Sequence, residues 1–222
     1  MYHSVAENAE FSTVSPKEFE RQIAFLHKHN FNVVSLSTLA DLITVSSKIP
    51  PKTICLTFDD GYQDNFLTVL PILRRYNFPA TVFSSTAYLG EVFTTPRDIK
   101  IKILSAEELR GLRNSGLVDI GSHNHHHKKL VRLEKEQVEL ELSTSFAILS
   151  GIIGQEINSL SYPNGRYDEV SEPIAKKMFK IICTVKPGRV MVGDSPQELK
   201  RNSIDSQVNF TQFKGIIKYG RI

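Results

Sequence analysis

Apolar residues along this chain recur at two alternating spacings. Phe19, Ile23 and Leu26 repeat at helical spacing after a Ser-Pro start at 15–16, which predicts a capped helix with proline at its first position. Similar patterns predict further helices over 37–46, 64–76, 105–116, 134–150 and 168–178, and a last one from residue 211. Compact apolar runs between them predict strands over 31–36, 53–58, 80–84, 117–120, 160–162 and 180–185.

Strands that alternate with helices indicate an α/β protein with a parallel sheet and helices packed outside it. No linker, low-complexity tract or repeat interrupts the series, so residues 1–222 are predicted to form a single domain. The alternation leaves open whether the sheet closes into a barrel. In both architectures the chemistry should lie beyond the carboxyl ends of the strands.

Composition excludes some classes of partner and location. The chain is 41% hydrophobic and carries a net charge of only +3, without a basic block, so no nucleic-acid partner is expected. No apolar run approaches the about 18 residues of a membrane span. Cys55 and Cys183 lie in apolar runs and indicate no disulfide framework. The first residues lack the features of a secretory signal, so the chain as written is expected to be cytoplasmic.

Two aspartates follow the strand predicted over 53–58. Adjacent side chains of a strand point to opposite faces, so Asp59 and Asp60 can reach one site only if the backbone turns, which Gly61 permits. One carboxylate would then hold a metal ion while the other acts as a base. The alternative is an Asp-Gly turn in which Asp60 caps the next helix.

Four histidines in GSHNHHHKKL follow the strand predicted over 117–120. The spacing of His123 and His127 places two imidazoles on one side of a turn, which is a common arrangement of metal ligands. The alternative is a solvated polar loop, and His125 and His126 are expected to be loop residues. Together with Asp60, the two outer histidines would form a three-ligand site with open positions, suited to Zn²⁺ or to another divalent ion such as Co²⁺, Ni²⁺ or Mn²⁺.

Three segments in this order, LTFDDGY, GSHNHHHKKL and SLSYPNGRYD, resemble the polysaccharide deacetylase family, also called the NodB-homology or carbohydrate esterase family 4 type. The resemblance covers nearly the whole chain and implies a distorted (β/α)7 barrel. It also implies metal-dependent removal of acetyl groups from N-acetylated or O-acetylated sugars, with an acetylated oligo- or polysaccharide as the partner. Asp59 matches the family's catalytic base, and Asp60, His123 and His127 match its metal ligands.

The third segment departs from the family pattern. It lacks the arginine that many members carry before Pro163, and Asn164 stands where an aromatic residue is usual. The resemblance implies that the backbone N–H of Asn164 helps to form an oxyanion site. Arg201 is hypothesised to supply the missing guanidinium to Asp59, with a surface arginine as the alternative. Tyr162 and Pro163 are predicted to belong to the substrate-binding site. Tyr162 would line a sugar cleft together with Tyr167, and core or turn packing is an equal alternative for the two tyrosines.

No histidine follows His127, although many members use a late histidine to protonate the leaving amine. His3 matches the position of that residue in a subgroup similar to the poly-N-acetylglucosamine deacetylases, in which the late motif comes first. The alternative is a frayed terminal residue. That subgroup has a strand before the motif, for which Met1 leaves no room, so a clipped start and an extracytoplasmic location stay open. His27 and His29 are expected at the surface.

Two other functions remain open from the sequence. One is an amidohydrolase that cleaves a C–N bond of a non-polymeric substrate, and the other is a non-catalytic carbohydrate-binding relative. The sequence leaves the oligomeric state undetermined.

Overall fold

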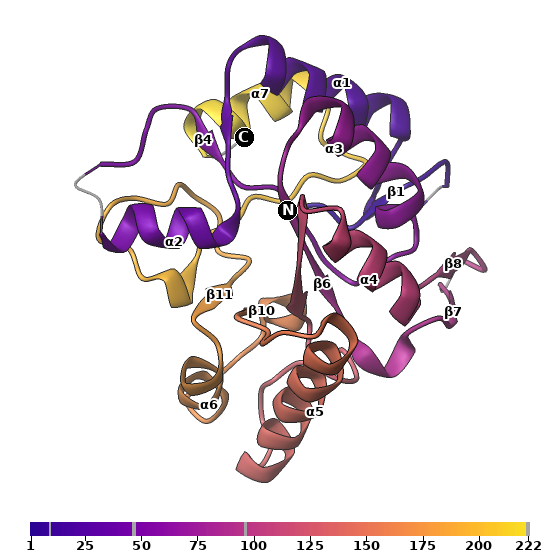
Figure 1. Cartoon of the computed structure of the whole chain (residues 1–222), viewed down its shortest axis with the longest axis vertical. Coiled ribbons are helices and arrows are strands. Elements are labelled where there is room, and N and C mark those ends of the chain that lie inside the picture. Colours follow the sequence, from indigo (N-terminus) through magenta and orange to yellow (C-terminus); the bar gives the residue numbers. More distant parts are fainter. Residues whose placement is uncertain (9, 46–47, 96, 221–222) are drawn as a thin grey trace.

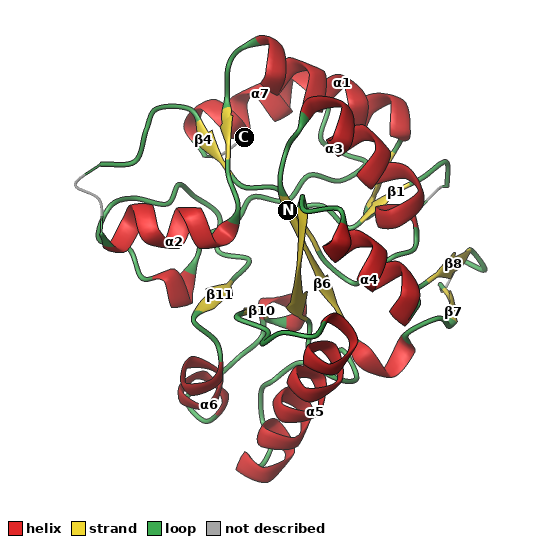
Figure 2. Cartoon of the chain, viewed as in Figure 1, coloured by secondary structure: helices red, strands yellow, loops and turns green. Residues whose placement is uncertain are grey.

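Parallel strands in the middle of the molecule form the sheet that carries the site (Figure 2). In this computed structural model, residues 1–8, 10–45, 48–95 and 97–220 are described. Within them the main sheet has the strand order β11-β10-β9-β6-β5, and every pairing in it is parallel. The strands are β5 (Thr57–Phe58), β6 (Ala80–Ser84), β9 (Val118–Ser122), β10 (Ser159–Ser161) and β11 (Ile181–Cys183).

Helices surround this sheet (Figure 1), as the alternating pattern predicted. They are α1 (Pro16–Lys28), α2 (Leu36–Thr44), α3 (Leu70–Tyr76), α4 (Ala106–Asn114), α5 (Lys135–Ile153), α6 (Ser171–Met178) and α7 (Phe210–Tyr219). Phe19, Ile23 and Leu26 of α1 are fully buried, and the Ser15 side chain accepts a hydrogen bond from the N–H of Glu18. The spacing and the cap read from the sequence are therefore confirmed for this helix.

Within the described residues, three two-stranded sheets accompany the main sheet. They are β1 (Ser4–Val5) paired with β2 (Thr13–Val14), β3 (Asn32–Val33) paired with β4 (Thr53–Ile54), and the antiparallel hairpin β7 (Val92–Thr94)–β8 (Lys100–Lys102). The N–H of Tyr2 donates to the carbonyl of Thr57, and the N–H of Asp59 donates to the carbonyl of Tyr2. On the other side of this segment, the N–H of Ile204 donates to the carbonyl of Met1. The parallel sheet thus curls into the arc of a distorted half-barrel, and the expected α/β class is confirmed.

Several element boundaries differ from the predictions. The strand expected over 31–36 is only Asn32–Val33, because Ser35 is the N-cap of α2 and accepts a hydrogen bond from the N–H of Thr38. The strand expected over 53–58 is divided into β4 and β5. The helix expected over 64–76 opens with a π-helical turn, Asn65–Val69, because Pro71 has no N–H to donate to the regular ladder. The predicted end of α2 at Ser46 lies outside the described residues.

The core joins the sheet to α1 through aromatic rings. Tyr2 stacks on Phe58 with ring centroids 5.3 Å apart, and Phe19 meets both rings edge-on. These ring contacts anchor the N-terminal segment in the core, so that His3, which follows Tyr2, lies at a fixed place beside β5.

Two further expectations concern the cysteines and membrane spans. Cys55 and Cys183 are free thiols. No helix within the described ranges is both long and apolar enough to cross a membrane.

Candidate active site

The aspartate pair lies at a sharp turn after β5. Asp60 and Gly61 both have a left-handed backbone, with φ of 71° and 67°. A Cβ atom on Gly61 would lie 2.5 Å from Oγ of Ser84, so the turn requires glycine both for its φ and for the space. The turn brings Asp59 and Asp60 to the same end of the sheet, as the sequence predicted, and the Asp60 side chain faces the histidines.

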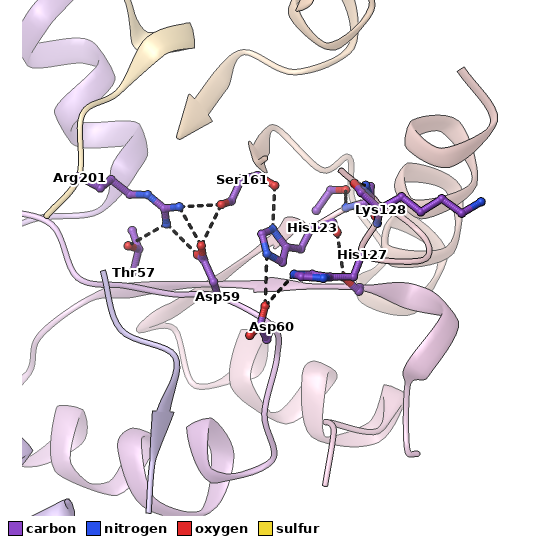
Figure 3. Close-up of polar contacts among 11 residues, drawn as sticks. Thr57, Asp59, Asp60, His123, His127, Lys128, Ser161 and Arg201 are labelled. Atoms are coloured by element: carbon purple, nitrogen blue, oxygen red, sulfur yellow. Dashed lines mark hydrogen bonds and ion pairs between the residues drawn. The ribbon is translucent and has the colours of Figure 1, made fainter. Parts of the chain in front are cut away.

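Asp60, His123 and His127 converge on one point (Figure 3). Oδ1 of Asp60 lies 3.3 Å from Nε2 of His123 and 3.1 Å from Nε2 of His127. One ligand atom from each residue lies within 4.8 Å of the other two. The structure therefore brings together the three predicted ligands, which come from the carboxyl ends of β5 and β9, with β6 between them.

The hydrogen bonds of His123 show that the triad fits a cation. Nδ1 of His123 lies 2.7 Å from the carbonyl oxygen of Ser161, which can only accept, so Nδ1 carries a proton. When the ring is neutral, Nε2 is therefore the nitrogen that carries the lone pair, and a divalent ion can bind it together with the Asp60 carboxylate. Burial acts to lower the pKa of His123, but the hydrogen bond with Asp60 and the charges of both aspartates raise it overall.

The charge of Asp60 matches this arrangement. Burial acts to raise the pKa of the Asp60 carboxyl, but its hydrogen bonds with His123 and His127 outweigh burial and hold the pKa well below the usual range. The carboxylate is therefore ionised at neutral pH, which is the form that binds a metal. His125 and His126 point to other partners, as expected for loop residues.

Asp59 is held by a buried arginine from a distant segment. Nη1 and Nη2 of Arg201 donate to Oδ1 and Oδ2 of Asp59 over 2.7 and 2.8 Å. Arg201 is 7% exposed, so the alternative of a surface arginine is wrong. Burial acts to raise the pKa of Asp59, but the charge of Arg201, followed by that of His123, lowers it well below the usual range. Asp59 is therefore ionised and fixed in orientation.

His3 lies beside the aspartates. Its backbone carbonyl accepts a hydrogen bond of 3.0 Å from the Asn65 side chain, and its neighbour Tyr2 is bonded to Thr57 and Asp59. These hydrogen bonds fix the backbone of His3 next to the aspartates. His3 is therefore not a frayed terminal residue, although its catalytic role stays a prediction. His27 and His29 are exposed, as expected.

The segment after β10 places Tyr162 and Pro163 inside the protein and Asn164 at its surface. Asn164 is exposed and adopts φ of 56°, whereas Pro163 is buried. Tyr162 is only 1% exposed and stacks on Tyr167 with ring centroids 4.3 Å apart. Tyr162 therefore packs in the core and does not line a cleft, because a buried ring has no surface that a sugar could contact. This is the alternative that the sequence left open. The role of the Asn164 N–H stays a prediction.

Ser161 is a site residue that the sequence reasoning missed. Its hydroxyl donates to Oδ2 of Asp59 over 3.0 Å and accepts from Nη2 of Arg201 over 2.7 Å, while its carbonyl accepts from His123. Ser161 therefore links the metal-ligand group to the aspartate–arginine pair. The only signal in the sequence is its place at the carboxyl end of a predicted strand, before the Tyr-Pro-Asn-Gly turn.

Comparison of the sequence with known proteins gives consistent matches. The profile of the family described as "Polysaccharide deacetylase" matches residues 46–179. "Putative polysaccharide deacetylase YxkH" of Bacillus subtilis (strain 168) is 26% identical over 219 residues, covering 98% of this chain and 75% of that protein. The poly-beta-1,6-N-acetyl-D-glucosamine N-deacetylase of Staphylococcus aureus (strain MSSA476) is 25% identical over 173 residues. That match covers 74% of this chain and only 58% of the staphylococcal protein.

Solved structures show the same fold. The structure of IcaB from Ammonifex degensii superposes with a TM-score of 0.87 at 19% identity, covering all of this chain and 95% of the other. The Streptococcus pyogenes deacetylase PplD, in complex with acetate, superposes with a TM-score of 0.84 at 20% identity, covering all of this chain and 96% of the other. At these identities the likeness concerns the fold.

Proposed function

The chain belongs to the polysaccharide deacetylase family, and on this premise we propose that it is a metal-dependent hydrolase of N-acetylated polysaccharide sugars. It would remove the acetyl group and release acetate. The observation that carries the proposal is the convergence of Asp60, His123 and His127, with ionised Asp59 held beside them by Arg201. A group of three ligands next to a separate carboxylate is typical of hydrolytic metal sites, which need a base as well as a Lewis acid.

Each residue has a part that follows from its contacts. Asp60, His123 and His127 would hold the divalent ion, for which Zn²⁺ is the first choice from the donor set. Such an ion polarises a carbonyl and lowers the pKa of a water ligand toward about 7. Asp59 is the proton acceptor. From the residues that the structure describes, its Oδ1 accepts one hydrogen bond, from Arg201, and its Oδ2 accepts two, which leaves a lone pair of Oδ1 for a water molecule.

Two further groups complete the proposal. The half-buried imidazole of His3 would deliver a proton to the departing sugar nitrogen, because hydrolysis of an amide needs an acid on the leaving amine. The backbone N–H of Asn164 would donate to the oxyanion that develops on the acetyl carbonyl, and losing one such donor typically costs about 2.7–4 kcal/mol. The left-handed backbone of Asn164 supports this placement, since it turns the chain sharply at the end of β10.

The relatives suggest a substrate class. The Staphylococcus aureus relative is named for poly-beta-1,6-N-acetyl-D-glucosamine, so we take β-1,6-linked N-acetylglucosamine oligomers as the first substrate to test. This chain spans less than two thirds of that protein, so the relative's name does not settle the substrate of this chain, and the substrate is a proposal to be tested. Chito-oligosaccharides, O-acetylated sugars and small amides form the comparison panel, and the last of these tests the amidohydrolase alternative.

The test measures bound metal and released acetate in the same samples. His127→Ala should lose both, because it removes a ligand. Asp59→Asn should keep the metal and lose acetate release, because it removes the base and leaves the three ligands in place. A metal-free protein that still releases acetate would contradict the proposal, and metal binding without any acetate release across the panel would favour the non-catalytic alternative.

A further inference from the structure

Glu141 holds the loop that carries the second histidine ligand. We propose that Glu141 of α5 is a positioning residue for the histidine loop, residues 123–128, and that it thereby sets the affinity of the metal site. This inference rests on the proposed function, since it concerns how the same site is kept ready to bind its ion. The resemblance to the family assigns no role to this residue.

The Glu141 carboxylate contacts both neighbours of His127. Its Oε2 accepts the backbone N–H of His126 over 2.9 Å. Its Oε1 accepts from Nδ1 of His126 and from Nζ of Lys128, each over 2.9 Å. Lys128 lies directly beside His127 in Figure 3. One side chain on a helix therefore fixes the residues before and after the ligand.

The loop needs such support because its backbone is strained. Asn124 and His127 both adopt left-handed conformations, with φ of 52° and 55°, which side chains with a Cβ atom rarely adopt. The Asn124 side chain joins the ends of the turn, since its Nδ2 donates to the carbonyl of Lys128 over 2.7 Å and its Oδ1 accepts the N–H of Lys128 over 3.2 Å. His127 is thus held in an unfavourable conformation that aims Nε2 at Asp60.

The other side of the loop is fixed by the segment after β6. Four successive carbonyls, those of residues 123–126, accept from four successive residues: Ser85 Oγ, Thr86 N, Ala87 N and Tyr88 Oη. These four hydrogen bonds hold the backbone carbonyls of residues 123–126, and none of them involves His127 or Lys128. The contacts of Glu141 begin where this series ends. The carboxylate therefore adds restraints at His126 and Lys128, the residues on either side of His127.

The position of Glu141 is unusual for a charged side chain. It is 5% exposed and lies on the buried face of α5, next to Val138 and Leu142. A buried carboxylate is costly unless it is paired and hydrogen-bonded, and the partners of Glu141 among the described residues all belong to the histidine loop. An apolar residue would pack α5 without this cost. The contact pattern thus points to the loop as the reason for the charge.

Two variants test the inference. Glu141→Gln is almost the same size and can still accept the N–H of His126, but its NH₂ group would face the donors of His126 and Lys128. Glu141→Ala removes every contact. Glu139→Gln is the matched control, because Glu139 is an exposed residue of α5 whose ion pair with Lys135 is 3.7 Å long.

The primary measurement is the Kd for Zn²⁺ by competition with a chromophoric chelator. The visible spectrum of the Co²⁺ form reports the geometry of the ligands. We expect Zn²⁺ affinity about 10-fold weaker in Glu141→Gln and up to about 100-fold weaker in Glu141→Ala, the range found when groups that orient metal ligands are removed. The Co²⁺ spectrum should change in both variants, and Glu139→Gln should match the wild type in both measurements.

The possible failures are distinguishable. Wild-type protein that binds no divalent ion would refute the proposed function and this inference with it. Wild-type protein that binds Zn²⁺ normally, alongside a Glu141→Gln variant with the same Kd and the same Co²⁺ spectrum, would overturn the inference alone. If Glu141→Ala does not fold, Glu141→Gln decides the question, because it preserves the volume of the side chain.

Discussion

Replacing Arg201 with methionine should show how much the buried Arg201–Asp59 ion pair contributes to the free energy of unfolding. Methionine fills a similar volume without charge or donors. The guanidinium makes five hydrogen bonds, namely two to Asp59 and one each to Thr57, Ser161 and Thr184. Arg201→Met removes all of them and leaves the Asp59 carboxylate buried without its main partner.

The expected cost follows from the burial of both partners. Breaking a buried, hydrogen-bonded ion pair from one side costs about 3–5 kcal/mol, mostly because the remaining charge has lost its compensation. Removing that charge as well, in Asp59→Asn with Arg201→Met, should restore part of the loss. We expect the double variant to be about 2–3 kcal/mol more stable than the sum of the two single effects.

Urea unfolding of the metal-free proteins, followed by circular dichroism, measures these differences. Arg75→Met is the control for the same substitution at an exposed site, where Arg75 pairs with Glu20 and the two side chains are 56% and 40% exposed. That variant should lie within about 0.5 kcal/mol of the wild type. In the wild type the lowered pKa of Asp59 stabilises the fold fully above the ordinary carboxyl value of about 3.9 and less as pH falls below it. The difference between wild type and Arg201→Met should therefore shrink on acidification.

The reasoning would be refuted if the stability losses of Arg201→Met and Asp59→Asn simply added in the double variant. An Arg201→Met variant that loses no more stability than Arg75→Met at neutral pH would refute it as well. Either result would mean that the two side chains do not depend on each other as the distances of 2.7 and 2.8 Å indicate.

Three further predictions concern other parts of the site. Gly61→Ala should destabilise the fold by about 1–3 kcal/mol and weaken Zn²⁺ binding, because its Cβ would meet Ser84 and its φ is left-handed; urea unfolding and chelator competition measure the two effects. His3→Gln should lower kcat for acetate release while the Kd for Zn²⁺ stays unchanged, because His3 is proposed as a proton donor and not as a ligand. Burial raises the pKa of Glu141, but its bonds with His126 and Lys128 lower it overall, so its stabilising effect is present above about pH 4.3 and lost as pH falls through the folded value. The unfolding free energies of wild type and Glu141→Gln should therefore converge below that pH.

Each of these predictions has a result that contradicts it. For Gly61→Ala it is wild-type stability together with wild-type metal affinity. For His3→Gln it is an unchanged kcat, or a fall in activity that comes with a loss of Zn²⁺. For Glu141 it is a stability difference that stays constant from pH 7 to pH 3.

The ligand residues could be predicted from the sequence because they lie in two short motifs at the ends of clear strands. Asp60 and His123 each follow an apolar run, and a parallel sheet places the ends of such runs together. Arg201 lies in a segment without regular secondary structure, so its own position gave no signal. Only the absence of an arginine before Pro163 suggested that Arg201 pairs with Asp59. Glu141 gives no local signal, because a glutamate in a long helix usually faces solvent.

The errors in the fold predictions have local causes. The pattern over 31–36 contains Ser35, and a serine that caps a helix ends the strand before it. Tyr162 follows a strand and precedes a turn, and such a position suits a cleft residue as well as a packed one. Its stacking on Tyr167 depends on how two segments meet in space, which no spacing within either segment encodes.

The placement of the ligands on separate strands would couple metal binding to folding. Asp60 comes from the end of β5 and the two histidines from the end of β9, so an unfolded chain does not hold them together. A cation would then select the folded state by mass action, adding about 2.7 kcal/mol of stability at a free concentration one hundred times its Kd. Metal supply would therefore act as a second control on how much folded protein persists.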